Sequence, residues 1–360
     1  MGFAAFKHFQ FQDRSALTNS QAQIIGCGFG FWHKLTLKVY FCTFLLNMAR
    51  YLITGGAGFI GSNMVEALLK RGEYVRVLDN FSTGRLSNLA PFLKDIELIE
   101  GDLRAYHIVM KAVRQVDYII HLAALPSVPR SLNDPLTTHD VNATGTLNLL
   151  HAASEVRIRR LVYASSSSIY GDTEAELKQE SFSPRPKSPY AVSKLAGEQY
   201  CQVFTEQFGV ACVALRYFNV FGPRQNPYSD YAAVIPKFIA LMLNDQAPTL
   251  FGEGLQTRDF TYVENVVEAN LLACDAPNVA GRVFNIACGQ KHSLLGLVEE
   301  LNYLLLKNMQ PQLAAERAGD VKHSQADIAL AKDHLLFKPT VQLREGLERT
   351  IKHFREKENG

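Results

Sequence analysis

The chain has 360 residues, of which 47% are hydrophobic and 20% charged, and its formal net charge is +2. These values are ordinary for a soluble globular protein and allow one large or two smaller domains. The small net charge gives no reason to expect a nucleic acid or an anionic membrane surface as partner, and no apolar run approaches the length of a membrane span. The six cysteines show no C-x-x-C spacing, so we predict no metal site and reduced thiols in a cytoplasmic protein.

Residues 1–47 do not follow the pattern of the rest of the chain. Phenylalanines fall there without a helix or strand period, and the apolar run Val39–Leu46 is too short to cross a bilayer. Basic residues outnumber acidic ones, so a targeting peptide is one interpretation. We favour another, because Met48 directly precedes the first strand. In this interpretation residues 1–47 are a non-core extension, either disordered or the product of a mis-assigned start.

The stretch that follows organises the chain. A short apolar run, Tyr51–Thr54, leads into glycines at positions 55, 56, 58 and 61, and apolar residues then recur at helical spacing up to Gly72, the expected C-cap. The pattern predicts a strand, a tight turn and a helix. Such a turn lets backbone N–H groups approach a pyrophosphate at the helix N-terminus, where the helix dipole favours an anion.

A carboxylate stands at the end of the next predicted strand. This strand is Tyr74–Leu78, and Asp79 follows it. A carboxylate at this place can accept both ribose hydroxyls of an adenosine and repels a 2′-phosphate. The glycine turn and Asp79 together predict a binding site that prefers NAD to NADP.

Strands and helices then alternate, which is typical of a parallel sheet with crossover helices. The expected strands are Ile96–Glu100, Tyr118–Ala124, Arg160–Ala164 and Cys212–Arg216, and the expected helices are Asp140–Ser154 and Tyr190–Phe208. We therefore predict an α/β fold in which residues 48–216 form a dinucleotide-binding domain around a doubly wound parallel sheet.

After Tyr217 the pattern is looser. It predicts helices over Ala232–Leu243, Leu294–Lys307 and Val341–Phe354, a strand followed by a helix over Thr261–Cys274, and a strand over Val283–Ala287. We predict that residues 217–355 form mainly a smaller C-terminal lobe that binds the substrate, while segments near 260–287 return to the first domain.

Two groups of side chains could carry chemistry. Tyr190 and Lys194 are four residues apart, so on a helix they share a face. A nearby ammonium and the positive charge of an oxidised nicotinamide both favour the tyrosine phenolate, which makes Tyr190 usable as a base near neutral pH. Ser165–Ser168 is a run of hydroxyls at the end of a buried strand, where ligands bind in a doubly wound sheet.

Taken together, these motifs resemble the extended short-chain dehydrogenase/reductase family. The resemblance covers about Ala49 to Phe354 and implies a Rossmann-type sheet. Within the family the chain is most similar to NAD-dependent UDP-sugar 4-epimerases, and more narrowly to the branch that acts on UDP-N-acetylhexosamines and their uronic acids. The narrower markers are Ser127–Ser131, Arg216–Gly222, Tyr231–Pro236, Arg258–Phe260 and Arg317–Asp320.

The resemblance implies roles for individual residues. In the active site Tyr190 is the base, Lys194 tunes it and holds the nicotinamide ribose, and Ser166 is the catalytic hydroxyl. The implied cofactor-binding residues are Gly55, Gly58, Phe59, Ile60, Gly61, Asp79, Asn80, Asp102, Leu103, Ala123, Asn142, Tyr190 and Lys194. The implied substrate-binding residues are Ser127, Arg130, Ser166, Ser167, Ser168, Tyr190, Asn219, Val234, Phe251, Arg258, Arg317, Asp320 and Ser324.

The implied reaction begins when the Tyr190 phenolate removes the proton of the sugar 4-hydroxyl, with Ser166 sharing that hydrogen bond. Hydride passes from C4 to NAD⁺, the resulting 4-keto sugar turns over in its pocket while the UDP stays anchored, and hydride returns to the other face. The net redox change is zero, so we expect NAD to be tightly bound and recycled. The resemblance also implies a homodimer, formed through the helices Asp140–Ser154 and Tyr190–Phe208.

Other reactions of the same fold fit the residues less well. Nucleotide-sugar dehydratases need an acid and a base at the two positions after the catalytic hydroxyl, and this chain has Ser167 and Ser168 there. UDP-glucuronate decarboxylases carry a glutamate where Ser168 stands. A non-catalytic NAD-binding relative is the alternative from a different class, and intact Ser166, Tyr190 and Lys194 are evidence against it.

The choice of sugar depends on few residues. Ser324 stands where relatives restricted to glucose and galactose have a bulky tyrosine, so a serine leaves room for an N-acetyl group at C2. We expect UDP-GlcNAc and UDP-GalNAc, or their uronic acids, as substrates. A UDP-glucose or UDP-glucuronate 4-epimerase is the alternative. Arg130 could bind a C6 carboxylate or could be structural. Whether the substrate is a uronic acid or a neutral sugar therefore stays open.

Overall fold

The computed structural model describes residues 48–172, 175, 177–229, 232–315 and 323–358. The predicted N-terminal extension therefore lies outside the described residues, as do two of the predicted substrate-binding residues, Arg317 and Asp320. The division into residues 48–216 and 217–355 remains a prediction. Among the described helices, none combines the length and the apolar character that crossing a membrane requires.

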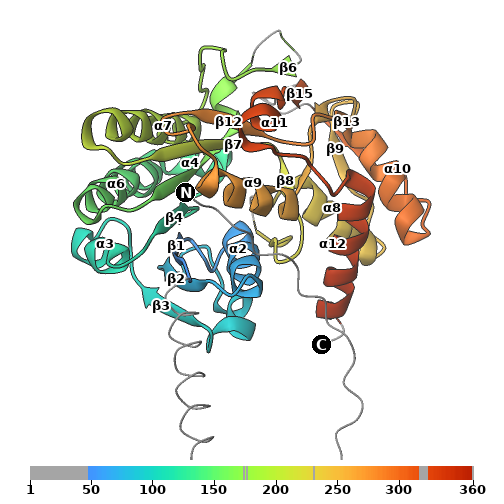
Figure 1. The fold of residues 1–360 in the computed structure, drawn as a ribbon. Helices are drawn as coiled ribbons and strands as arrows, with labels where there is room; N and C mark the ends of the chain where they lie inside the picture. The colour runs from blue at the N-terminus through green and yellow to red at the C-terminus, as the bar shows by residue number, and fades with distance from the viewer. Residues whose placement is uncertain (1–47, 173–174, 176, 230–231, 316–322, 359–360) are drawn as a thin grey trace, which may run out of the picture. The chain divides into compact units, whose positions relative to one another are not determined.

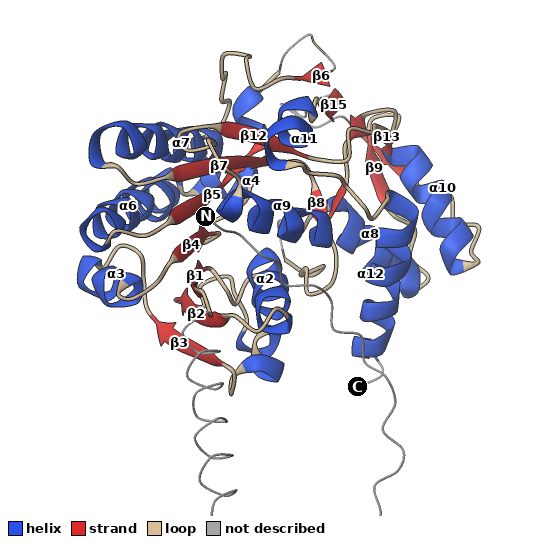
Figure 2. Ribbon diagram, in the orientation of Figure 1, coloured by secondary structure: helices blue, strands red, loops and turns tan. Residues whose placement is uncertain are grey.

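Seven parallel strands form the main sheet, in the order β12-β7-β5-β4-β1-β2-β3, and Figures 1 and 2 show them stacked one above another. The order reverses between β1 and β4, so this is the switch point at which doubly wound sheets bind their ligands. The strands are β1 (Arg50–Thr54), β2 (Tyr74–Asp79), β3 (Ile96–Glu100), β4 (Tyr118–His121), β5 (Arg160–Ser166), β7 (Cys212–Tyr217) and β12 (Val283–Ile286). The predicted Rossmann-type sheet is confirmed.

Two of the main-sheet strands end more than one residue away from the predicted position. The strand expected to run to Ala124 ends at His121, because its partner β1 ends at Thr54, the residue that pairs with His121, and turns into the glycine loop. β5 instead runs two residues past Ala164, to Ser166, because β7 continues beside it as far as Tyr217. The second difference brings Ser166 into the sheet itself.

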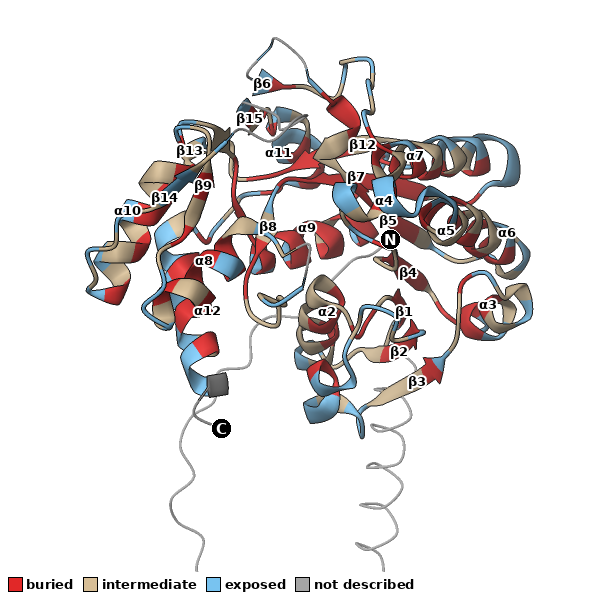
Figure 3. Ribbon diagram, turned by 180° about the vertical axis from the view of Figure 1, so that it is seen from behind, coloured by how far each residue is buried: buried red, intermediate tan, exposed pale blue. Residues whose placement is uncertain are grey.

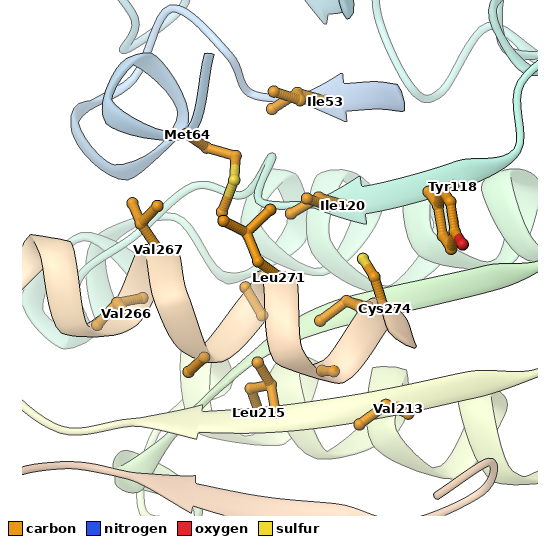
Figure 4. Close-up of a cluster of buried hydrophobic side chains, with 14 of the residues drawn as sticks. Ile53, Met64, Tyr118, Ile120, Val213, Leu215, Val266, Val267, Leu271 and Cys274 are labelled. Carbon is orange, nitrogen blue, oxygen red and sulfur yellow. The ribbon is translucent and has the colours of Figure 1, made fainter. Parts of the chain in front are cut away.

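Helices cover both faces of the main sheet. On one face lie α2 (Phe59–Lys70), α9 (Val263–Asp275) and α11 (Ala329–Leu335), and on the other lie α3 (Tyr106–Val113), α6 (Gly145–Val156) and α7 (Pro189–Phe208). In Figure 4, Met64 of α2 and Leu271 of α9 meet beside the strand residue Ile120, with Ile53 of the neighbouring strand close by. All four side chains are nearly or fully buried, and each contributes about 1.5–3 kcal/mol by leaving water.

The helix predicted to begin at Asp140 begins earlier. Residues 135–156 are helical without a break, as α5 (Pro135–His139), a π-helical turn at Asp140–Thr144 and α6. Asp134 caps this run by accepting from the Thr137 N–H (3.1 Å), and Pro135 occupies the first turn, where its missing N–H costs nothing. A short helix that the sequence analysis did not predict, α4 (Val128–Asn133), precedes it.

The C-terminal third contributes to more than one layer. Figure 1 shows α8 (Val234–Leu243), α10 (Leu294–Leu305) and α12 (Leu343–Glu358) side by side, away from the main sheet, and their apolar faces share one buried cluster. In the same third, α9 and β12 belong to the main sheet's layers. Figure 3 shows that burial is concentrated on the strands and on the helix faces turned toward them.

Short strands and turns complete the fold. A four-stranded sheet joins β13 (His292–Ser293), β10 (Thr257–Arg258), β15 (His323–Ala326) and β6 (Leu177–Lys178). Two pairs are formed by β8 (Val220–Phe221) with β11 (Thr261–Tyr262) and by β9 (Thr249–Phe251) with β14 (Gln312–Ala314). Three single turns of 3₁₀ helix lie at η1 (Leu86–Asn88), η2 (Ala90–Phe92) and η4 (Ser167–Tyr170).

Candidate active site

The turn between β1 and α2 leaves no room for a side chain at Gly55, and the first turn of α2 leaves none at Gly61. Gly55 has φ +73°, and a Cβ there would lie 2.7 Å from the backbone of Ala123. A Cβ on Gly61 would lie 2.1 Å from the carbonyl oxygen of Gly55. The loop therefore packs backbone against backbone at the switch point of the sheet, as a close approach to a pyrophosphate requires.

The N-terminus of α2 suits an anion. The helix begins at Phe59, its N-cap Gly58 makes no side-chain capping bond, and its first turn, with Ile60 and Gly61, contains no acidic residue. The first N–H groups of a helix have no intrahelical partner, and with the helix dipole they favour negative charge. The residues present fit the pyrophosphate of NAD. At the other end the C-cap is Arg71, one residue before the predicted Gly72, whose φ of +76° lets the chain leave the helix.

Asp79 holds the glycine loop. Its Oδ2 accepts from the N–H of Ala57 (2.9 Å) and its Oδ1 from the N–H of Phe81 (2.8 Å), and the residue is buried. Burial raises the pKa of this carboxyl, while the backbone donors oppose the shift. Because each carboxylate oxygen has more than one lone pair, both can still accept ribose hydroxyls. That role remains a prediction.

The residues predicted for the adenosine side lie together. Asn80 donates to Oδ2 of Asp102 (2.7 Å), and Arg104 donates to the same carboxylate from its backbone N–H (2.9 Å) and its guanidinium (2.9 Å). These donors, Arg104 first, lower the pKa of Asp102 to about 2. Leu103 is buried against Gly145. An ionised Asp102 is therefore ready to accept from an adenine amino group.

Asn142 connects the loop after β4 to α7, the helix that carries Tyr190 and Lys194. Its Oδ1 accepts from the Leu125 N–H (2.7 Å), and its Nδ2 donates to the Leu125 carbonyl (3.1 Å) and to Oγ of Ser193 on α7 (3.1 Å). Asn142 is thus a positioning residue in this structure. Ala123, the other predicted residue of this region, lies against Gly55.

Ser166, Tyr190 and Lys194 come together from two elements. Ser166 ends β5, and Tyr190 and Lys194 lie on the first turns of α7, which Ser188 caps by accepting from the Ala191 N–H (3.2 Å). Burial raises the pKa of Tyr190, and a side-chain hydrogen bond with Ser166 opposes the shift. Lys194 Nζ donates to the Ala164 carbonyl (2.8 Å), and burial lowers its pKa to about 8.

The serine run forms a short relay of hydroxyls. Ser166 Oγ accepts from the N–H (3.2 Å) and the Oγ (2.9 Å) of Ser168. Ser167 and Ser168 begin the η4 turn directly after β5, so they lie at the carboxyl edge of the sheet beside Ser166. Neither hydroxyl can donate or remove a proton as a carboxylic acid would at neutral pH.

The remaining predicted substrate residues come from loops, small sheets and a helix outside the main sheet. Ser127 has φ +95° and caps α4 by accepting from the Arg130 N–H (3.4 Å). Asn219 donates to the Asp259 carbonyl (3.1 Å). Arg258 of β10 pairs in register with Ser324 of β15, which is mostly buried. Val234 begins α8, and Phe251 ends β9.

The sequence analysis missed a buried histidine next to the cofactor loop. His121 at the end of β4 bonds through Nδ1 to Thr54 Oγ1 (2.7 Å) and through Nε2 to Thr146 Oγ1 (2.8 Å). Burial lowers its pKa to about 3, so the ring is neutral at any working pH. Its position at a strand end beside the switch point was the available signal. The ring keeps Thr54, the residue before Gly55, in place.

The sequence analysis also assigned no role to Asp259, although it lies within one of the resemblance markers. Its fully buried carboxylate accepts from the N–H groups of Cys288 (3.0 Å), Gly289 (3.0 Å) and Ala326 (3.2 Å). Burial raises its pKa to about 7, and the backbone donors oppose that shift. Asp259 therefore ties the segment that contains Arg258 to β15. Its hydrogen-bond partner on β15, Ala326, is two residues from Ser324.

Comparison with known proteins agrees with this geometry. Residues 51–287 match the family described as "NAD dependent epimerase/dehydratase family". The chain is 35% identical over 312 residues to a UDP-glucose 4-epimerase of Mycolicibacterium smegmatis, covering 86% of this chain and 99% of the relative.

Two solved structures are also similar. A UDP-N-acetylglucosamine 4-epimerase from Methanobrevibacter ruminantium, solved with UDP-N-acetylmuramic acid, shares 39% identity at a TM-score of 0.83, covering 86% of this chain and 99% of that one. A mutant of a UDP-glucuronic acid 4-epimerase from Bacillus cereus, solved with NAD and UDP-4-deoxy-4-fluoro-glucuronic acid, shares 32% identity at a TM-score of 0.80, covering 85% of this chain and 99% of that one. The chain therefore belongs to the NAD-dependent epimerase/dehydratase family of extended short-chain dehydrogenases/reductases, and its cofactor is NAD.

Proposed function

We propose that this protein is a UDP-sugar 4-epimerase that inverts C4 of a UDP-N-acetylhexosamine or of its uronic acid. The observation that carries the proposal is the arrangement of Ser166, Tyr190 and Lys194 next to the glycine loop, with serines at 167 and 168. The 39% identity to a UDP-N-acetylglucosamine 4-epimerase supports the N-acetyl branch. A cytoplasmic location remains a prediction.

Each of the three residues has a part in the proton transfer. Tyr190 removes the proton of the sugar 4-hydroxyl, because Lys194 stabilises its phenolate. Ser166 hydrogen-bonds to the sugar 4-hydroxyl while the proton leaves. The hydrogen bond that Ser168 Oγ donates to Ser166 Oγ orients the Ser166 hydroxyl. When bound, NAD accepts a hydride from C4 and returns it. Lys194, which donates to the Ala164 carbonyl, has further N–H groups for the nicotinamide ribose.

The UDP must stay anchored while the keto sugar turns. Arg258 is the described candidate for the diphosphate, since a guanidinium matches phosphate oxygens. Asn219 lies close to Arg258, because its side chain donates to the carbonyl of the next residue, Asp259. Arg317 for the diphosphate and Asp320 for the uridine ribose complete the proposal, on segments outside the described residues.

The serines favour epimerisation over the other reactions of this family. Elimination of water needs a proton donor and a base beside the keto sugar, and Ser167 and Ser168 supply neither at neutral pH. The carboxylate nearest in sequence to the active-site residues, Glu198, is committed to a buried ion pair with Arg216. A second candidate is a UDP-glucose or UDP-glucuronate 4-epimerase, which the 35% and 32% identical relatives favour.

The direct test is NMR of purified protein incubated with UDP-GlcNAc, UDP-N-acetylglucosaminuronic acid or UDP-glucose, with no cofactor added. We expect new anomeric signals of the C4 epimer with an N-acetylated substrate. Turnover without added NAD shows that the cofactor is resident. Loss of water or of carbon dioxide from the sugar would instead show a dehydratase or a decarboxylase.

The choice between N-acetylated and plain UDP-hexoses should depend on Ser324. The wild type is expected to convert UDP-GlcNAc with a higher kcat/KM than UDP-glucose. Ser324→Tyr should lower kcat/KM for the N-acetyl sugar by about tenfold or more and leave UDP-glucose nearly unchanged, because the phenol fills the space beside C2. Ser324→Ala is the matched control with no added volume. A wild type that clearly prefers plain hexoses would contradict the choice of sugar.

We also propose a homodimer formed through the side of the molecule that carries α5 and α7. Leu136 of α5 and Val192 of α7 are 82% and 49% exposed and line one surface groove. Leu136→Glu/Val192→Glu should halve the mass measured by light scattering, because two charges would be buried. Leu313→Glu, at a 66% exposed leucine on β14, is the control and should leave the mass unchanged. A monomeric wild type would refute the dimer.

A further inference from the structure

A buried ion pair lies directly behind the catalytic residues. Glu198 on α7 and Arg216 on β7 are each 4% exposed. The guanidinium grips the carboxylate with two bonds, Nε to Oε1 (3.0 Å) and a terminal nitrogen to Oε2 (2.9 Å). Ser165, the residue before Ser166, donates its hydroxyl to Oε1. One carboxylate thus joins the catalytic helix, the strand β5 that ends in Ser166, and β7.

The pair continues toward the smaller sheet. Arg216 donates to the Tyr170 hydroxyl (2.8 Å) and lies over the Tyr170 ring, 4.8 Å from its centroid. The Tyr170 hydroxyl donates to Oδ1 of Asn285 (2.7 Å), whose Nδ2 donates to the carbonyls of Lys178 (3.0 Å) and Asp327 (3.0 Å). Tyr170 closes the η4 turn of Ser167 and Ser168. The network therefore ends at the segments that flank the sugar site.

Burying such a pair is not needed for stability alone. Two charges lose their hydration on entering the protein, and well-packed apolar residues in their place are often as stable or more stable. What the pair does provide is fixed geometry and a negative end, Glu198, held on α7 while the positive end, Arg216, stays on β7. Both act on Lys194, because Glu198 follows it by one helical turn, and residues four apart share a helix face.

The charges around Lys194 single out Glu198. The groups that face the ammonium in the described structure are Glu198 and Cys201 on α7, Tyr163 on β5, whose ring centroid is 5.1 Å away, and His121 on β4. Burial raises the pKa of Tyr163 and Tyr190 and lowers that of His121, so these groups are uncharged near neutral pH. A hydrogen bond with Cys212, together with burial, raises the pKa of the Cys201 thiol and keeps it uncharged as well. Burial lowers the pKa of Lys194, and Cys201 and Glu198 raise it. Arg216 faces Glu198, and Glu180 faces Arg216.

We propose that Glu198, clamped by Arg216 and Ser165, is a positioning residue that keeps Lys194 protonated and aligned with Ser166, and so sets the alkaline limit of the reaction. This inference rests on the proposed function, in which the Lys194 ammonium supports the Tyr190 phenolate. The carboxylate touches neither sugar nor cofactor. It acts through Lys194.

The test is the pH profile of kcat/KM for Glu198→Gln. The amide keeps the shape of the side chain and removes its charge, so Lys194 loses its proton at lower pH. We expect the alkaline limb to move down by roughly one pH unit, the size of shift that one nearby opposite charge produces. The acidic limb should move less, since Glu198 acts on Tyr190 only through Lys194. A purely structural role would lower the rate at every pH and leave the limbs where they were.

Two variants serve as controls. Ser165→Ala removes a hydrogen bond from the carboxylate but no charge, so its limbs should match the wild type. Glu198→Met/Arg216→Met leaves no unpaired charge and is the variant to use if the amide fails to fold. It should still show the lowered alkaline limb. Glu198 lies on the same helix as Lys194 and Arg216 lies on β7, so the lost negative charge affects Lys194 more than the lost positive charge does. If the alkaline limb of the kcat/KM profile lies at the same pH as in the wild type in every Glu198 variant that folds, the proposal is overturned.

A second readout separates this proposal from the proposed function. The ultraviolet absorbance of the Tyr190 phenolate, taken as the difference between each protein and its Tyr190→Phe counterpart with NAD bound, can be titrated without turnover. An apparent pKa that differs between the wild type and Glu198→Gln supports the role of Glu198 even if no UDP-sugar is converted. An unchanged titration overturns it, whatever the activity.

Discussion

Tyr190→Phe is expected to abolish epimerisation while NAD remains bound. The substitution removes only the hydroxyl, which is the group that takes the proton from the sugar. A positioned general base contributes about 10²–10⁴-fold to a rate, so kcat should fall by at least this factor. The ring stays in its buried site beside Ser166, and the glycine loop is untouched. NAD released by denaturing the purified variant should equal the wild-type amount.

The control for this variant is Tyr303→Phe, at a tyrosine that is 65% exposed on α10. It should leave kcat unchanged. Retained epimerisation in Tyr190→Phe would refute Tyr190 as the base. Loss of both activity and NAD would mean that the hydroxyl is needed for the cofactor site itself, and the kinetic result alone would then not identify a base.

Gly61→Ala is expected to weaken NAD binding. A methyl group at this position would lie 2.1 Å from the Gly55 carbonyl oxygen and 2.7 Å from Gly56 Cα. Both are backbone atoms, so no side-chain rotation relieves the contact and the loop must move away from α2. Overpacking typically costs 1–3 kcal/mol. If the loop bears that cost only when it is closed on NAD, the affinity falls by roughly tenfold to a hundredfold.

The measurement is NAD content after purification, followed by titration with added NAD. Gly209→Ala is the matched control, because Gly209 also has a positive φ, +70°, but has nothing within 4 Å of its would-be Cβ. It should lower the thermal midpoint slightly and keep NAD. Wild-type NAD content in Gly61→Ala would show that the close backbone packing is not required for binding.

The local elements of the fold could be predicted because their signals are local. Apolar spacing and the glycines at 55, 58 and 61 predicted β1, the turn and α2, and the run Pro189–Phe208 differs from its prediction by one residue at the start. Errors occurred where a neighbour decided the end of an element. β4 stops at His121 because β1 stops beside it, and α5 begins before Asp140 because Asp134 caps it.

The site was predicted only as far as short spacings and a family resemblance reach. Tyr190 and Lys194 are one helical turn apart, and the family resemblance assigned Ser166. Nothing in the local pattern joins Glu198 to Arg216, or His121 to Thr54, which are 67 residues apart in the chain. These pairs form because β4 lies beside β1, although β2 and β3 come between them in the chain, and because β7 lies beside β5.

By itself the sequence therefore determined the α/β class, the nucleotide turn and the identity of the residues expected to react. Only the tertiary structure decided which buried groups surround them. The physical reason is range: periodicity and turn chemistry act over a few residues, whereas strand order and register place distant strand ends at one edge. At that edge a buried carboxylate, Glu198, comes to lie behind the serines of β5, and a neutral histidine, His121, behind the glycine loop.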